Sequence, residues 1–283
     1  MRSMVRRFAS VVLISILTAC LPPSEVGRFA RSASETTAAF PPVAREMYAS
    51  CLRYEGYRAQ RTARGWYDSE SLRVSCAARD SAVNGVLAAN RILSAYFAAL
   101  SRLADDKAAS TDNELTRLAT VAKKSGMQEG QVNAVAALAK YMTSNFTGVY
   151  RRKKLTDAIT SQNGNVTFVT TGLRDVINGD YRRLLLIESR AVNDFYRSVV
   201  TENRGRDALT TVLVLKDRDE KVAALQKRTE DLDAYVRALD AVRMGHQKLY
   251  EHRNQVRAKD VSADLIRHAE TLERIGRQLE KAF

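Results

Sequence analysis

From residue 43 onward, apolar side chains recur three or four positions apart, which is the spacing of one face of an α-helix. Pro does not occur after Pro42 and Gly is sparse, whereas Ala, Leu, Arg, Glu and Lys are frequent. The pattern predicts an all-α protein built from long helices. The expected helices cover residues 43–63, 70–105, 114–124, 129–161, 166–203, 209–257 and 261–282.

The C-terminal quarter has the most regular pattern, with two apolar series that each repeat every seven residues. The first series is Leu225, Leu232 and Leu239, and the polar residues His246 and Arg253 continue its spacing. The second series is Tyr235, Val242, Leu249 and Val256. After a turn expected near Lys259-Asp260, apolar residues again alternate three and four apart. Such repeats form left-handed coiled-coil seams. We therefore expect an elongated bundle of long antiparallel helices with a coiled-coil-like C-terminal hairpin.

Two features interrupt the helical pattern in the middle of the chain. Asn163-Gly164-Asn165 is a turn signal, and it suggests a division of the helical domain 41–283 into sub-bundles 41–161 and 162–283. The β-branched runs 166–171 and 210–215 are typical of strands. We expect helix at both runs because each merges into strongly helical sequence, and a small strand pair is the alternative.

The first 20 residues follow a different pattern. Arg2, Arg6 and Arg7 precede a short apolar run from Val11 to Leu17, and Leu17-Thr18-Ala19-Cys20 closes the segment. This order resembles the signal peptide and lipobox of bacterial lipoproteins. The resemblance is limited to residues 1–20, and it implies removal of residues 1–19 and attachment of lipid to Cys20. The alternative is an ordinary secretory signal that contains a chance Cys.

Residues 20–40 are expected to form the lipidated Cys and a flexible tether. Pro22-Pro23 breaks structure, and small polar residues follow among Ala without a sustained apolar period. Leu21 stands where an Asp would retain an enteric lipoprotein at the inner membrane, so the resemblance implies anchoring at the periplasmic face of the outer membrane. No other apolar run approaches the roughly 20 residues that span a bilayer.

The two remaining cysteines, Cys51 and Cys76, have only each other as an intramolecular partner once Cys20 is lipidated. An export compartment oxidises thiols. Both cysteines lie on the expected inward faces of adjacent helices, at comparable distances from one turn. We therefore predict a Cys51–Cys76 disulfide, with two buried free thiols as the alternative.

The chain is strongly basic. Its formal net charge is +13, and removal of residues 1–19, which hold three Arg and no acidic residue, leaves +10. This excess favours anionic surfaces, but behind an export signal we do not expect nucleic acid as a partner. The run Arg151, Arg152, Lys153 and Lys154 is a candidate contact for anionic headgroups or an acidic partner, and otherwise it is a solvated helix face.

We find no catalytic or metal-binding motif in the sequence. There is no His-Glu-x-x-His motif, no nucleophile elbow and no phosphate-binding Gly loop, so we predict no catalytic residue, no metal site and no cofactor. His246 and His268 occupy seam positions of helices expected to face each other. They are a conceivable metal pair or pH sensor, and we favour polar residues that fix the register of the seam.

These observations predict a non-catalytic, membrane-anchored periplasmic lipoprotein. Its expected role is that of a helical interaction or scaffold module, with envelope proteins as partners or with self-association through the seams. A binding module for an anionic lipid, a glycan or a small ligand is the alternative, and an enzyme with an unrecognised site is the least favoured class.

Overall fold

The fold was analysed in a computed structural model. The structure describes residues 23–63, 68–105, 107, 114–146, 151–203, 207–253 and 258–282. The predicted signal peptide and Cys20 therefore lie outside the described residues. Within these ranges the elements are α1 (Pro23–Ala38), α2 (Pro41–Ala63), α3 (Ser69–Ala104), α4 (Glu114–Ala122), α5 (Glu129–Asn145), α6 (Arg151–Val176), the π-helical turn η1 (Ile177–Tyr181), α7 (Arg182–Glu202), α8 (Ala208–Glu251) and α9 (Ala258–Ala282).

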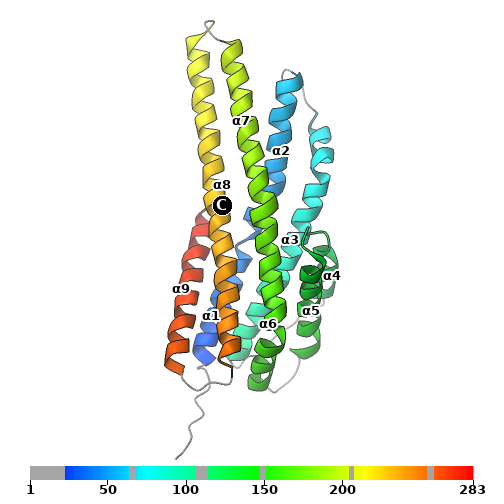
Figure 1. The fold of residues 1–283 in the computed structure, drawn as a ribbon, viewed down its shortest axis with the longest axis vertical. Helices are drawn as coiled ribbons and strands as arrows, with labels where there is room; N and C mark the ends of the chain where they lie inside the picture. The colour runs from blue at the N-terminus through cyan, green and yellow to red at the C-terminus, as the bar shows by residue number, and fades with distance from the viewer. Residues whose placement is uncertain are drawn as a thin grey trace, which may run out of the picture.

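The helices form an elongated antiparallel bundle, as predicted (Figure 1). The 44 residues of α8 span about 66 Å at 1.5 Å per residue, and α6, η1 and α7 form a second long rod beside it. In the lower half of Figure 1, these rods pack with α1, α9, α4, α5 and the second half of α3. In the upper half, only α2, the first half of α3, α7 and α8 continue. The all-α architecture is confirmed.

One hydrophobic core runs through the described part of the chain and joins its N-terminal and C-terminal helices. Phe40, between α1 and α2, stacks on Tyr235 of α8 with ring centroids 3.8 Å apart. Helix α6 continues without interruption through residues 161 and 162. The suggested boundary between sub-bundles 41–161 and 162–283 therefore falls inside α6, and the core contains residues from both sides of it.

The flexible tether predicted for residues 20–40 is also wrong for the residues that the structure describes. Residues 23–38 form helix α1, whose Val26, Phe29, Ala30 and Ala33 are buried in the core. Their spacing of three and four is a helical stripe that the many Ser and Thr residues obscure. Because those polar side chains are short, α1 packs closely on its neighbours, and Thr36 donates a hydrogen bond of 2.9 Å to the carbonyl of Leu272 in α9.

The C-terminal hairpin has the predicted pairing of α8 and α9, with the turn in a different place. Leu232, Leu239, Tyr235 and Val242 are buried along the seam of α8. Helix α8 ends at Glu251 and α9 begins at Ala258, so Lys259-Asp260 lies inside the first turn of α9 rather than between the helices.

The predicted break at Asn163-Gly164-Asn165 lies inside α6, and the chain instead leaves helix between α5 and α6. The Asn163 side chain, a turn former in isolation, is held by α8, because its amide donates a hydrogen bond of 2.7 Å to Gln247. Both β-branched runs are helical. In the first run, Thr170 donates its hydroxyl proton back to the carbonyl of Val166, which satisfies the polar group within the helix.

Among the described helices, α3 alone is long and apolar enough to cross a membrane by length and composition, and 67% of its most apolar window is buried inside the bundle. This burial is typical of a core helix.

Candidate binding groove

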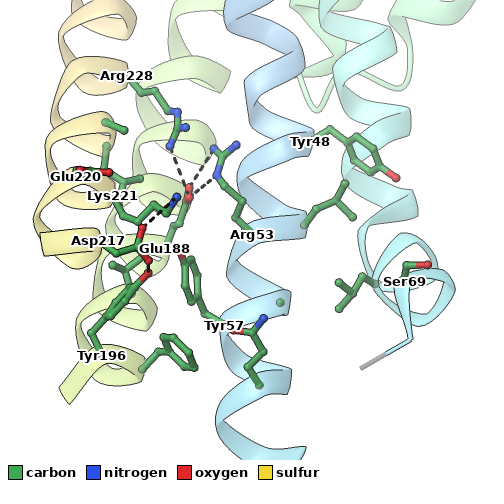
Figure 2. A pocket seen from close by; sticks show the side chains of 18 of the residues that line it. Tyr48, Arg53, Tyr57, Ser69, Glu188, Tyr196, Asp217, Glu220, Lys221 and Arg228 are labelled. Atoms are coloured by element: carbon green, nitrogen blue, oxygen red, sulfur yellow. Dashed lines mark hydrogen bonds and ion pairs between the residues drawn. The ribbon is translucent and has the colours of Figure 1, made fainter. Parts of the chain in front are cut away.

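A groove of about 980 Å³ lies in the upper half of the bundle. Figure 2 shows α2 running through its middle, with α3 on one side and α7 and α8 on the other. The groove is the upward continuation of the seam of α8. Leu225 lines the groove, whereas Leu232, two turns below, is fully buried. The cavity exists because α1 and α9 cover this seam only in the lower half.

Aliphatic and aromatic side chains from four helices form the sides of this groove. They are Leu52, Tyr57, Leu72, Val192, Phe195, Tyr196 and Leu225. The aromatic rings pack against one another. The ring centroid of Tyr57 lies 5.5 Å from that of Phe195 and 6.2 Å from that of Tyr196. A concave apolar surface with a few fixed polar groups is typical of a ligand or partner site.

A buried charge network lies at one side of the groove (Figure 2). The Glu188 side chain of α7 is only 1% exposed, and it accepts hydrogen bonds from Ser50 and from Arg53 Nε at 2.5 Å. Arg228 Nη1 lies 3.7 Å from the same carboxylate. Glu46 accepts a hydrogen bond of 3.0 Å from Arg53 and forms an ion pair with Arg228 at 3.0 Å. Two carboxylates and two guanidinium groups thus neutralise one another between α2, α7 and α8.

The environment of these charges shifts the pKa values of nearby groups. Burial alone would lower the pKa of Arg53, but its hydrogen bonds and charge interactions with Glu188 and Glu46 raise it overall. Burial is the main cause that raises the pKa of Tyr181, the last residue of η1, and of Tyr196, whose hydroxyl also donates to Asp217. These groups keep one protonation state near neutral pH, so they are suited to positioning rather than to proton transfer.

The predicted disulfide is present and lies at the α3 side of the groove. Cys51 of α2 and Cys76 of α3 are bonded, with Cα atoms 6.0 Å apart. We call residues 69–82, the first part of α3, the α3 arm. Ser69, Leu72 and Arg73 of this arm line the groove, and Asp68 caps the arm by accepting hydrogen bonds from the backbone amides of Glu70 and Ser71.

The predicted anionic contact lies at the opposite end of the bundle. Arg151, Arg152, Lys153 and Lys154 form the first turn of α6, at the lower end in Figure 1. Lys153 and Lys154 line a separate recess of about 690 Å³ with Tyr141, Asn145 and Asp157. The first turn of α1 lies at this end as well, three residues after Cys20 in the sequence.

The histidine pair considered as a metal site or pH sensor does not form around His246. Its Nε2 lies 2.9 Å from the Tyr96 hydroxyl, and its Nδ1 lies 3.0 Å from Asn163 Oδ1. Both ring nitrogens are therefore engaged, as expected for a polar residue that fixes the seam. Complete burial lowers the pKa of His246 to about 3. Within the described residues, no group of three or more His, Cys, Asp or Glu side chains is placed to hold a metal ion.

Sequence reasoning missed the Glu188 network. A signal was available, because Glu188 falls on the same helical stripe as Leu184, Leu185 and Val192, where an acidic residue is unusual. Its partners Arg53 and Arg228 lie 135 and 40 residues away in the chain, so only the tertiary structure identifies them. Comparisons of the chain with known protein families, with curated proteins and with solved structures found no match.

Proposed function

We propose that this protein is a non-catalytic lipoprotein of the bacterial cell envelope that binds an α-helical segment of another envelope protein. The observation that carries the proposal is the groove between α2, the α3 arm, α7 and α8. Lipid on Cys20 would anchor the protein, at the periplasmic face of the outer membrane according to the resemblance of its first 20 residues to lipoprotein signals.

The shape of the groove supports an α-helix as its occupant. The lining residues of α2 run from Tyr48 to Gln60, a rise of about 18 Å or more than three helical turns. The groove also prolongs a seam that α1 and α9 fill in the lower half of the bundle. An amphipathic helix laid there would bury its apolar face as those helices do.

The direction of the anchor supports a protein partner at the groove. Because α1 begins three residues after Cys20, the lower end of the bundle would lie on the membrane and the groove would face away from it. Exposed apolar residues also lie at the end of the bundle away from α1, where Leu209, Val212 and Leu213 of α8 are more than half exposed. Apolar side chains gathered at one end are typical of an interaction surface.

Site-specific photo-crosslinking in cells tests this proposal. A photoreactive amino acid at Lys221 faces the groove, and one at the exposed Lys140 of α5 serves as the matched control. We expect an adduct with a distinct envelope protein from position 221 alone, and we expect Leu225→Arg to reduce it by placing a charge in the apolar wall. Equal adducts from both positions, or none from position 221, would contradict the proposal.

Binding of anionic lipid is the second candidate function, and the recess beside Lys153 and Lys154 favours it. Two cations, a Tyr and an Asn line the recess together with one acidic residue, Asp157, at the end of the bundle where α1 begins. Co-sedimentation of the Cys20→Ala protein with phosphatidylglycerol vesicles measures this contact without the anchor. Lys153→Glu with Lys154→Glu should abolish salt-sensitive binding, whereas Lys123→Glu with Lys124→Glu should leave most of it. Equal losses in the two pairs would indicate a general charge effect.

A further inference from the structure

The α3 arm buries few of its side chains against the bundle. Of residues 69–82, only Cys76 is buried, and Leu72, Arg79, Ser81 and Ala82 are half-buried. The remaining side chains of the arm are exposed, including Val74 at 68%. From Val83 onward the pattern changes, because α3 enters the core and most of its side chains are buried. The boundary between the arm and the core part of α3 is therefore sharp.

The physical consequence concerns the stability of the arm. An isolated helix of about 14 residues is marginal in water, and most helical stability in proteins comes from packing an apolar face. The arm has little such packing, and its half-buried Leu72 lies beside Gly56 of α2. The covalent bond from Cys76 to Cys51 is thus the principal constraint that keeps the arm against α2.

We propose that the Cys51–Cys76 disulfide is a thiol-controlled latch on the groove. When the disulfide is intact, the arm is a fixed wall that presents Ser69, Leu72 and Arg73 to the groove. When the disulfide is reduced, the arm detaches and frays while the rest of the bundle stays folded. The groove then loses one wall, and a helix that binds there loses contacts with it. This effect on a partner rests on the proposed function, whereas the detachment of the arm does not.

The reaction is an exchange with a dithiol reductant. A thiolate of the reductant attacks the sulfur of Cys51, which is the less buried of the two cysteines, and Cys76 leaves as a thiolate that takes up a proton. The second thiol of the reductant, as its thiolate, then displaces Cys51, which is protonated in turn. Two electrons and two protons pass to the protein, and the reductant becomes a disulfide.

Hydrogen exchange followed by mass spectrometry tests the latch on the protein alone. The oxidised protein, the protein reduced with dithiothreitol, and Cys51→Ser/Cys76→Ser are compared. We expect amide exchange in residues 69–82 to accelerate by at least about tenfold on reduction while residues 83–104 keep their protection. The double variant should resemble the reduced protein with or without dithiothreitol, which separates loss of the bond from other effects of the reductant.

Two outcomes would overturn the proposal. If residues 69–82 stay protected after reduction, non-covalent contacts hold the arm. If protection is lost equally throughout the bundle, the disulfide stabilises the whole fold and is not a latch. Crosslinking from Lys221 in the double variant distinguishes this proposal from the proposed function. If the parent protein forms the adduct and the double variant forms it equally well, the latch is contradicted and the proposed function is not. If neither protein forms the adduct, the proposed function is contradicted.

Discussion

Glu188 is a carboxylate on the apolar face of α7, and its burial has a definite energetic consequence. Removing a charge from water is unfavourable, and the attraction of its partners offsets this only when the geometry is good. Ser50, Arg53 and Arg228 supply that geometry from two other helices. Such a network contributes little net stability compared with a well-packed apolar core, but removal of the Glu188 charge leaves two half-buried guanidinium groups with Glu46 as the one carboxylate of the network.

We therefore predict that Glu188→Gln lowers the free energy of unfolding by roughly 3 kcal/mol. Urea denaturation followed by circular dichroism measures the loss. The matched control is Glu230→Gln, which changes an exposed carboxylate on α8 and should shift stability by less than about 0.5 kcal/mol. Similar values for the two variants would show that the buried network does not depend on the charge of Glu188.

His246 is buried in the core, and both of its ring nitrogens have hydrogen-bonding partners. The side-chain NH2 of Asn163 donates a hydrogen bond to Gln247. The side-chain oxygen of Asn163 therefore faces His246 and accepts a hydrogen bond from Nδ1–H. The Nε2 atom is then the acceptor for the Tyr96 hydroxyl. Burial disfavours the charged imidazolium, and it lowers the pKa of His246 to about 3.

The lowered pKa predicts a dependence of stability on pH. Between the unfolded pKa of 6.5 and the folded pKa of about 3, the unfolded chain binds a proton at His246 that the folded protein does not. The contribution of His246 to the free energy of unfolding is therefore fully present above pH 6.5. It decreases as the pH falls, and the loss is about 2 kcal/mol at pH 5.

Urea denaturation at pH 7.5 and pH 5.0 measures this dependence. His246→Gln should reduce the difference between the two pH values by that amount. Tyr96→Phe, which keeps the imidazole buried, should retain most of it. An unchanged difference in His246→Gln would mean that other groups cause the acid sensitivity.

At the scale of elements, α1 joins helices from distant parts of the chain. It lies between α3 and α9, and Phe29 packs on Gly245 of α8, where an added Cβ would come within 2.2 Å of the ring. On its α9 side, Arg28 forms a salt bridge of 3.2 Å with Glu273. A segment that resembles a spacer in composition is thus part of the core.

Phe29→Ala tests this role, and we predict a loss of about 3–5 kcal/mol in the free energy of unfolding. Phe29 is completely buried, whereas Phe168 of α6 is 56% exposed and provides a control of identical chemistry. Phe168→Ala should lower stability by much less, as measured by the same urea denaturation. If the two substitutions have equal effects, α1 is not an integral part of the folded bundle.

At the scale of the whole molecule, the position of α1 would link the proposed lipid anchor to the direction of the bundle. With only residues 21 and 22 between Cys20 and α1, a lipidated protein would have little freedom to move away from the bilayer. The first turn of α6 would be near the headgroups, and the tip of α8 would be about 60 Å away.

Spin labels on the lipidated protein in vesicles measure this orientation. A label at Lys153→Cys should be relaxed strongly by a paramagnetic lipid headgroup, and a label at the exposed Val212→Cys should be unaffected. The Cys20→Ala protein provides the control, because its release from the membrane should remove most of the effect at position 153. Equal relaxation at both positions would mean that the bundle lies along the membrane.

The regular parts of the fold could be predicted from the sequence by itself. The helices at 43–63 and 70–105 match α2 and α3 closely, the seams of α8 and α9 pair, and the Cys51–Cys76 disulfide forms. These features depend on local spacing, on helix propensity and on the small number of cysteines, all of which are visible along one chain.

The tertiary structure alone decided the features that depend on distant residues. Asn163 stays helical because Gln247 and His246 occupy its side chain. Residues 23–38 form a core helix because the surfaces of α3 and α9 accept its narrow apolar stripe. The groove exists because α1 and α9 cover only half of the seam, a property of how the helices pack. Local sequence specifies which segments favour helix, but the partners of each buried face are set by packing across the whole molecule.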